Sequence, residues 1–264
     1  MQKDAQWFWD VEFWEYFAPI MFDDAHWAEV PAVADAVTRL SRFNLYGETS
    51  GKDWKKPLET QPRVLDLCCG TGRISGELAR MGFAVTGVDI TESFLKAAKE
   101  DAEYEKFNVE YIQADVREFV RPDYFDTIIN LYISFGYFSD QKDDLKVLKN
   151  VYKSLKKDGT FIIETLGKEI VSRDFEEAQW FERDGGFVLT EYKPLESWTF
   201  LENRWILVKD GKKTEKTFVQ RLYSASELRI LLAAAGFNDI DFFGDWDETP
   251  YDQNAAKLIA VCRK

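Results

Sequence analysis

The sequence predicts an α/β protein with a mostly parallel sheet that helices cover on both faces. Two observations predict it. Between residues 63 and 164, short apolar segments alternate with segments of helical periodicity, and a glycine-rich turn follows the first apolar segment. Nearly continuous apolar strands separated by helices are typical of a parallel sheet that is buried on both faces.

The elements of this core follow one another in order. The pattern of residues 4–46 is helical, and the polar segment 47–52 ends it. The expected core strands are 63–67, 83–89, 109–112, 125–131 and 160–164, and the expected helices between them are 74–81, 91–104 and 145–155. We expect the last helix to stop at 156–159, because lysines suit its negative end and Gly159 suits a left-handed cap.

Residues 168–223 interrupt the alternation. Segments of alternating apolar and polar residues predict antiparallel strands at 187–192, 197–201, 204–209 and 217–222, the last two joined by a turn at Asp210-Gly211. Ser224-Ala225-Ser226-Glu227 then matches a capping box that begins a helix, and Gly236 ends it. Two closing strands are expected at 237–243 and 256–262. We therefore divide the chain into a helical lid (1–60), an α/β core (61–167), an antiparallel insertion that caps the site (168–223) and a closing segment (224–264).

Composition excludes several classes of function. The net charge of −13 argues against nucleic acid, which requires concentrated Lys and Arg, and against anionic membranes. The N-terminus has no signal-peptide pattern, and the longest mostly apolar run, 127–138, is too short to span a bilayer. Cys68, Cys69 and Cys262 fit neither a metal site nor a disulfide framework. We expect a cytoplasmic protein without a bound metal.

The glycine-rich turn lies in Val64-Leu65-Asp66-Leu67-Cys68-Cys69-Gly70-Thr71-Gly72. A turn between a first strand and a first helix commonly holds a nucleotide. Asp66 would repel a pyrophosphate but attract a ligand that carries an ammonium group and a positive sulfur. The third glycine of a dinucleotide-binding turn is also missing. The turn therefore favours S-adenosylmethionine over NAD(P).

Two further acids follow the next two strands. Asp89 ends the second strand, where a carboxylate can accept hydrogen bonds from both ribose hydroxyls. Asp115 follows the third strand and could accept the adenine amino hydrogen, with Val116 against the ring. Taken singly, Asp66 could instead cap the following helix, and Asp89 could simply end a strand.

Residues 63–165 resemble the core of the class I S-adenosylmethionine-dependent methyltransferases, which is Rossmann-like. The two strands after Gly236 are similar to the reversed hairpin that completes the seven-stranded sheet of that family. The resemblance implies that Asp66, Gly70, Gly72, Asp89 and Asp115 contact the cofactor. The remaining candidates for cofactor contacts are Tyr16, Cys68, Thr71, Arg73, Ile90, Val116, Asn130 and Leu131. Cys68 stands where the family usually has glycine, and we expect a slightly tighter loop that still binds.

Several candidates have two interpretations. Arg73 could pair with the methionine carboxylate or lie in solvent, and Tyr16 could cover the cofactor or pack among aromatic residues. Cys68 and Cys69 could form a reactive pair, although buried small side chains are favoured. His26, the only histidine, could be a general base or part of the packed structure.

The segment after the fourth strand, 131–138, is expected to face the reaction site, and it lacks the motifs of methyltransferases that act on nucleic acids. We therefore expect methyl transfer to a small molecule by in-line displacement, and we name no catalytic base. The alternatives are an NAD(P)-dependent oxidoreductase and a non-catalytic S-adenosylmethionine-binding protein. The aromatic residues of the insertion could line the substrate pocket or form its own small core: Trp180, Phe181, Trp198, Phe200, Trp205 and Phe218.

Overall fold

A computed structural model describes residues 7–42 and 61–264 of the chain. Of the expected helical pattern at 4–46, residues 4–6 and 43–46 lie outside the described residues, as do residues 1–6 and 43–60 of the expected lid. Within 7–42, the helical pattern is confirmed as a short 3-10 turn followed by three helices: η1 (Trp7–Trp9), α1 (Val11–Met21), α2 (Asp24–Ala28) and α3 (Val30–Leu40).

The core is the expected mostly parallel sheet of seven strands. Its strands are β1 (Arg63–Leu67), β2 (Ala84–Asp89), β3 (Val109–Gln113), β4 (Phe125–Asn130), β5 (Leu155–Thr165), β10 (Asp239–Phe243) and β11 (Leu258–Arg263). They lie in the order β10-β11-β5-β4-β1-β2-β3, and β11 pairs antiparallel with both β5 and β10. The order reverses between β1 and β4, which is where open α/β sheets bind their ligands.

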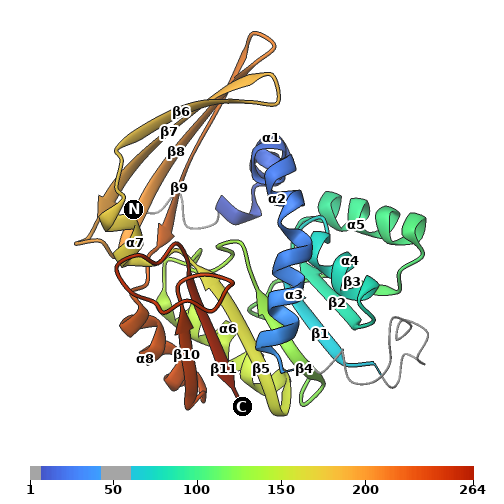
Figure 1. Cartoon of the computed structure of the whole chain (residues 1–264). Helices are drawn as coiled ribbons and strands as arrows, with labels where there is room; N and C mark the ends of the chain where they lie inside the picture. Colours follow the sequence, from blue (N-terminus) through green and yellow to red (C-terminus); the bar gives the residue numbers. More distant parts are fainter. Residues whose placement is uncertain (1–6, 43–60) are drawn as a thin grey trace.

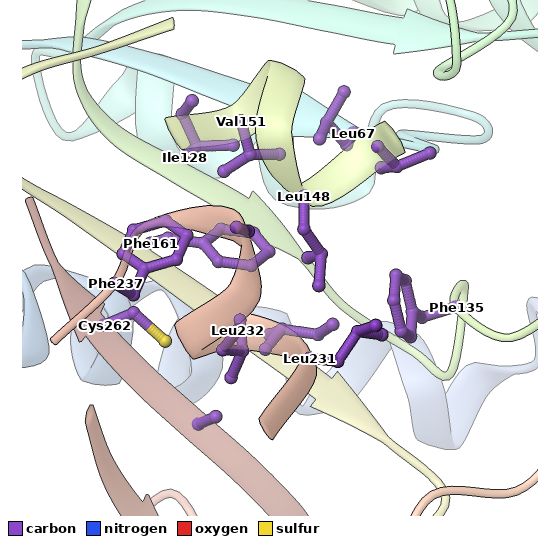
Figure 2. Packing of buried hydrophobic residues seen from close by; sticks show 14 of the residues in the cluster. Leu67, Ile128, Phe135, Leu148, Val151, Phe161, Leu231, Leu232, Phe237 and Cys262 are labelled. Atoms are coloured by element: carbon purple, nitrogen blue, oxygen red, sulfur yellow. The ribbon is translucent and has the colours of Figure 1, made fainter. Parts of the chain in front are cut away.

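Helices cover both faces of this sheet (Figure 1). On one face, α3 and α4 (Arg73–Arg80) pack on Val64 of β1 and Val85 of β2, and α5 (Glu92–Glu105) packs beside them on β2 and β3. On the other face, α6 (Gln141–Ser154) and α8 (Ala225–Ala235) pack together over the sheet. Figure 2 shows Leu148 of α6 and Leu232 of α8 among residues of the strands. The sheet is therefore buried on both faces, as its apolar strands predicted.

The insertion forms a second, antiparallel sheet after the short helix α7 (Lys168–Arg173). Its strands are β6 (Ala178–Arg183), β7 (Gly186–Leu195), β8 (Phe200–Lys209) and β9 (Lys212–Arg221). The turn at Asp210-Gly211 is confirmed, with both residues at positive φ. The prediction of two separate strands at 197–201 and 204–209 was wrong, because the single strand β8 continues through Asn203. Strand β6 was also not predicted from the sequence. In Figure 1 this sheet rises beyond the core next to α1, and Phe13 and Phe17 of α1 pack on its Val188 and Phe218.

The end of α6 differs from the expectation. The helix stops at Ser154, and β5 begins at once with the fully buried Leu155, which pairs with Phe125. Asp158, and not Gly159, has the left-handed backbone. A Cβ on Gly159 would lie 2.9 Å from the Lys156 carbonyl oxygen, so glycine is needed here for a close approach within a bulged strand. The capping box at Ser224 and Glu227 is confirmed.

Among the described helices, none combines the length and the apolar character needed to cross a membrane.

Candidate active site

A cavity of about 690 Å³ opens where the two sheets meet, at the carboxyl ends of the core strands. Its floor comes from the residues that follow β1 to β5. Part of its wall comes from α1 and the segment after it, and another part comes from the inner face of the β6–β9 sheet, on which α1 packs. A volume of this size is typical of sites that enclose a small ligand.

The turn after β1 is shaped by three residues in the left-handed region. Cys68 (φ 58°), Gly70 (φ 55°) and Gly72 (φ 78°) all have positive φ. A Cβ on Gly72 would collide with the hydroxyl of Tyr111, so this position requires glycine. Cys68 bears a backbone conformation that costs a residue with a Cβ about 1–2 kcal/mol. The turn therefore keeps its shape although cysteine replaces the usual glycine.

Asp66 is one of the two most buried acids of the cavity, together with Glu164. Asp66 is 4% exposed, and its Oδ2 accepts a hydrogen bond of 2.6 Å from Ser75 Oγ at the start of α4. Burial, followed by the nearby charge of Asp89, raises the pKa of Asp66 to about 7 in spite of this bond. A cationic ligand at this point would stabilise the ionised carboxylate.

Asp89 ties the end of β2 to the turn. One oxygen accepts a hydrogen bond from Gly70 N at 2.9 Å, and the other accepts one from Thr91 N at 2.8 Å. Burial raises its pKa despite these bonds. A carboxylate has about four lone-pair positions, so each oxygen of Asp89 can still accept a hydrogen bond from a hydroxyl group of a ligand.

Asp115 is held by Arg117. Arg117 Nη2 lies 2.6 Å from Asp115 Oδ2, and Arg117 also pairs with Asp143. Burial would raise the pKa of Asp115, but the hydrogen bonds and charge of Arg117 outweigh it and keep the pKa below its usual value. The carboxylate is therefore fixed and ionised at the cavity wall.

Arg73 connects the turn to the N-terminal segment. It is 8% exposed, so the interpretation that it lies in solvent was wrong. Its Nη1 donates a hydrogen bond of 2.7 Å to the His26 carbonyl oxygen, and its guanidinium lies over the rings of Phe22 and Tyr132. The Phe22 ring also lies against Gly70. The segment after α1 thus covers the turn.

His26 also borders the cavity. Its Nδ1 lies 2.6 Å from Asp23 Oδ1, and Asp23 in turn pairs with Arg183 of β6. The side chain is 39% exposed. Asp23 therefore orients the ring and at the same time links the N-terminal segment to the second sheet.

The segment after β4 has an unusual backbone. Tyr132 (φ 54°) and Ile133 (φ 63°) are consecutive residues in the left-handed region, which a β-branched residue rarely adopts. Glu164 Oε2 accepts a hydrogen bond from Tyr132 N at 3.0 Å, and Gln220 Nε2 donates to the Ile133 carbonyl oxygen at 3.2 Å. Such backbone strain persists only where the surroundings hold it, and it is common at functional sites.

Most of the candidate cofactor residues lie together at the cavity. The candidates that line it are Asp66, Cys68, Gly70, Arg73, Asp89, Ile90, Asp115, Val116 and Leu131. Gly72 and Thr71 belong to the same turn without lining the cavity. Asn130 points its amide at the Leu67 carbonyl oxygen and borders a small adjoining cavity. Burial raises the thiol pKa values of Cys68 and Cys69, which agrees with inert small side chains.

Tyr16 is not at the cavity. Helix α1 directs Phe13, Phe17 and Ile20 inward and leaves Tyr16 49% exposed. Among the aromatic residues of the insertion, Trp205 and Phe218 line the cavity, whereas Trp180 is 68% exposed on the outer face. Phe181 packs with α1, Trp198 packs on Phe175, and Phe200 lies beneath Arg221.

Several cavity residues were not anticipated from the sequence. They include Phe22, Glu29, Glu164, Asn203, Gln220 and Lys257. Glu164 carried a usable signal, since it is a charged residue at the end of a buried apolar strand. It is 4% exposed and pairs with Lys257 at 2.8 Å. The alternation of β8 would have placed Asn203 and Trp205 on one face.

Comparison with known proteins agrees with this site. A family model described as a methyltransferase domain matches residues 64–159, which contain the turn and all three acids. A glycine/sarcosine N-methyltransferase of Aphanothece halophytica is 28% identical over 207 residues, covering 76% of this chain and 76% of that protein.

Two solved structures share the fold. An S-adenosylmethionine-dependent methyltransferase from Clostridium acetobutylicum superposes with a TM-score of 0.69 at 19% identity, covering 86% of this chain and 96% of that one. CalS10 from Micromonospora echinaspora, an amino pentose methyltransferase solved with its cofactor, gives 0.64 at 17% identity, covering 90% and 92%. Residues 64–159 therefore form a methyltransferase domain, and the chain as a whole shares the fold of S-adenosylmethionine-dependent methyltransferases.

Proposed function

We propose that the protein transfers a methyl group from S-adenosylmethionine to a small-molecule acceptor by in-line displacement. The observation that carries this proposal is the continuity of the cavity. One end is bordered by the acids that follow β1, β2 and β3, and the other is an aromatic chamber enclosed by α1 and the β6–β9 sheet. Donor and acceptor would thus share one enclosed space.

The residues at the first end suit the parts of the cofactor. Asp66 would bind the ammonium group, Asp89 the two ribose hydroxyls and Asp115 the adenine amino group. Arg73 would bind the carboxylate, since its guanidinium is buried at the same end. Three acids at the ends of three strands fit a ligand without phosphates and would repel a pyrophosphate. The turn contributes backbone amides and, at Gly70, the absence of a Cβ.

The second end would position the acceptor. Trp7, Trp14, Tyr137, Trp205 and Phe218 line it with rings. When bound, the cofactor supplies a methyl group on a positive sulfur that is a good leaving group. The chain would mainly hold the acceptor in line with that bond and exclude water, which accelerates a displacement by restricting the two reactants. The small-molecule assignment is supported by the cavity volume of about 690 Å³, which is typical of sites for small ligands.

Two measurements test this function. Calorimetry with S-adenosylhomocysteine, NADH and NADPH should show binding of S-adenosylhomocysteine alone, and binding of a nicotinamide cofactor alone would refute the proposal. Incubation with methyl-labelled S-adenosylmethionine and a metabolite extract should place the label in a small molecule. A protein that binds S-adenosylhomocysteine yet never transfers label would be a binding protein and not an enzyme.

A further inference from the structure

The inner wall of the second sheet carries polar groups at the acceptor end of the cavity. Asn203 and Trp205 alternate along β8, and Phe218 and Gln220 alternate along the neighbouring β9. All four line the cavity, because residues two apart on a strand share a face and Asn203 is paired with Phe218. Two amides and one indole N–H are therefore set in a wall that is otherwise mostly apolar.

The orientation of both amides is fixed by backbone carbonyls. Asn203 Nδ2 donates to the Leu201 carbonyl oxygen at 3.0 Å. Gln220 Nε2 donates to the carbonyl oxygens of Ile133 and Phe135 at 3.2 and 3.1 Å. An amide nitrogen only donates, so the oxygen of each side chain remains as an acceptor. Neither oxygen receives a hydrogen bond from a side chain or backbone group in residues 7–42 or 61–264.

These amides are nearly inaccessible except through the cavity. Asn203 is 5% exposed and Gln220 is 6% exposed. Neither side-chain oxygen is among the fully buried unpartnered atoms of the described residues, so each is accessible from the cavity, and a ligand that offers N–H groups can bind there. The Trp205 indole N–H is buried and has no partner among the described residues. The two accessible amide oxygens of the wall therefore suit a ligand with hydrogen-bond donors.

The charges around the cavity disfavour anionic acceptors. Four carboxylates line the cavity in addition to the three strand-end acids, namely Glu29, Glu164, Asp174 and Glu176, and two of the four are paired, Glu164 with Lys257 and Asp174 with Arg173. The lysine and arginine of the described lining are both engaged, Lys257 with Glu164 and Arg73 with the His26 carbonyl oxygen. A carboxylate, phosphate or phenolate ligand would be repelled, and the aromatic rings favour a cation.

We infer that the methyl acceptor is a primary or secondary amine of a small polar molecule, held through its N–H groups by Asn203 Oδ1 and Gln220 Oε1. This inference rests on the proposed function. An amine that binds as its ammonium form first loses one proton to water, which frees the nitrogen lone pair. The lone pair forms the new N–C bond as the S–C bond of the cofactor breaks and S-adenosylhomocysteine leaves, and the methylated ammonium product then releases a second proton to water. Because the first proton is lost before the transfer, no base has to act in the transfer step itself, in contrast to transfer to a hydroxyl group.

The first experiment determines which atom is methylated. The purified protein is incubated with methyl-¹³C S-adenosylmethionine and a metabolite extract separated by ion exchange into cationic, neutral and anionic fractions. We expect label in the cationic fraction, with the ¹³C shift of an N-methyl group. An O-methyl or C-methyl product, or label confined to the anionic fraction, would overturn the inference and leave the proposed function intact. Absence of label from every fraction, with S-adenosylhomocysteine still bound, would refute both.

The second experiment tests the wall itself with the amine found in the first. Asn203→Leu removes the acceptor oxygen at similar volume, and we expect the KM of the amine to rise on the order of tenfold, because a hydrogen bond to a donor of this kind is lost. The Kd of S-adenosylhomocysteine should not change. The matched control is Thr190→Val, since Thr190 Oγ1 is also buried and unpartnered on this sheet but does not line the cavity. An unchanged KM in Asn203→Leu, or an equal rise in Thr190→Val, would contradict the assignment.

Discussion

The two ends of the cavity are built in different ways. At the cofactor end, Asp66, Asp89 and Asp115 each follow a strand of the same parallel sheet, and they lie within 50 residues of sequence (115 minus 66 is 49). At the acceptor end, the lining comes from α1, the segment after β4 and the β6–β9 sheet. Under the proposed function, recognition of the cofactor would be local in the sequence, whereas recognition of the acceptor would depend on contacts between distant segments.

The largest expected effect concerns the cofactor end. Asp89→Ala removes a carboxylate that would accept two ribose hydroxyls and already holds Gly70. Hydrogen bonds to charged groups contribute about 1.5–3 kcal/mol each, so the Kd of S-adenosylhomocysteine should rise by about 100-fold or more in calorimetry. Asp101→Ala, on the exposed side of α5, is the control and should leave Kd unchanged. An unchanged Kd in Asp89→Ala would remove its assignment to the ribose.

The next effect is a pH dependence confined to the cofactor end. Asp66 has a pKa of about 7 without ligand, so it is increasingly neutral as the pH falls below 7 and binds an ammonium group less well. The ratio of Kd for Asp66→Asn to Kd for the unmodified protein should fall by about 10-fold from pH 8 to pH 6. The ligand's own titration is common to both proteins and cancels in the ratio. A ratio that stays constant with pH would show that Asp66 does not carry the ammonium contact.

A smaller effect is expected at the acceptor end. Gln220→Leu frees the carbonyl oxygens of Ile133 and Phe135 and so loosens the segment after β4. Loss of interactions worth about 1 kcal/mol should lower kcat/KM about fivefold, while the Kd of S-adenosylhomocysteine stays the same. Gln253→Leu, at an exposed position, is the control. If Kd changed as much as kcat/KM, the two ends would not be separable.

The smallest effect concerns the stability of the turn. Cys68 has positive φ and Cys69 does not. Cys68→Gly should therefore be more stable than Cys68→Ala by about 0.5–1 kcal/mol, because glycine relieves more strain than it costs in chain entropy. At Cys69 the order should reverse, with alanine the more stable replacement. Urea unfolding of the four variants measures this, and the same order at both positions would contradict the explanation.

The sequence was sufficient for the core sheet and for the three acids, since strand ends and turns are set by neighbouring residues. It was not sufficient for the acceptor end. Whether Trp180 or Trp205 faces inward depends on the register between β6, β7 and β8, and a missed β6 left that register undefined. Tyr16 was misplaced for a similar reason, because only the packing of α1 on the second sheet decides which of its aromatic residues turn inward. The place of Glu164 at the cavity could have been predicted from the sequence, because it is a charged residue at the end of an apolar strand. In the sequence analysis it was assigned only to that strand.

The N-terminal segment contacts both ends of the cavity. Phe22 lies on Gly70 of the cofactor turn, Trp14 and Met21 of α1 line the acceptor chamber, and Asp23 pairs with Arg183 of the second sheet. If a ligand at one end orders this segment, the cost of ordering it for a ligand at the other end is lowered. The two ligands would then be thermodynamically linked, and each would increase the affinity of the protein for the other by the same factor.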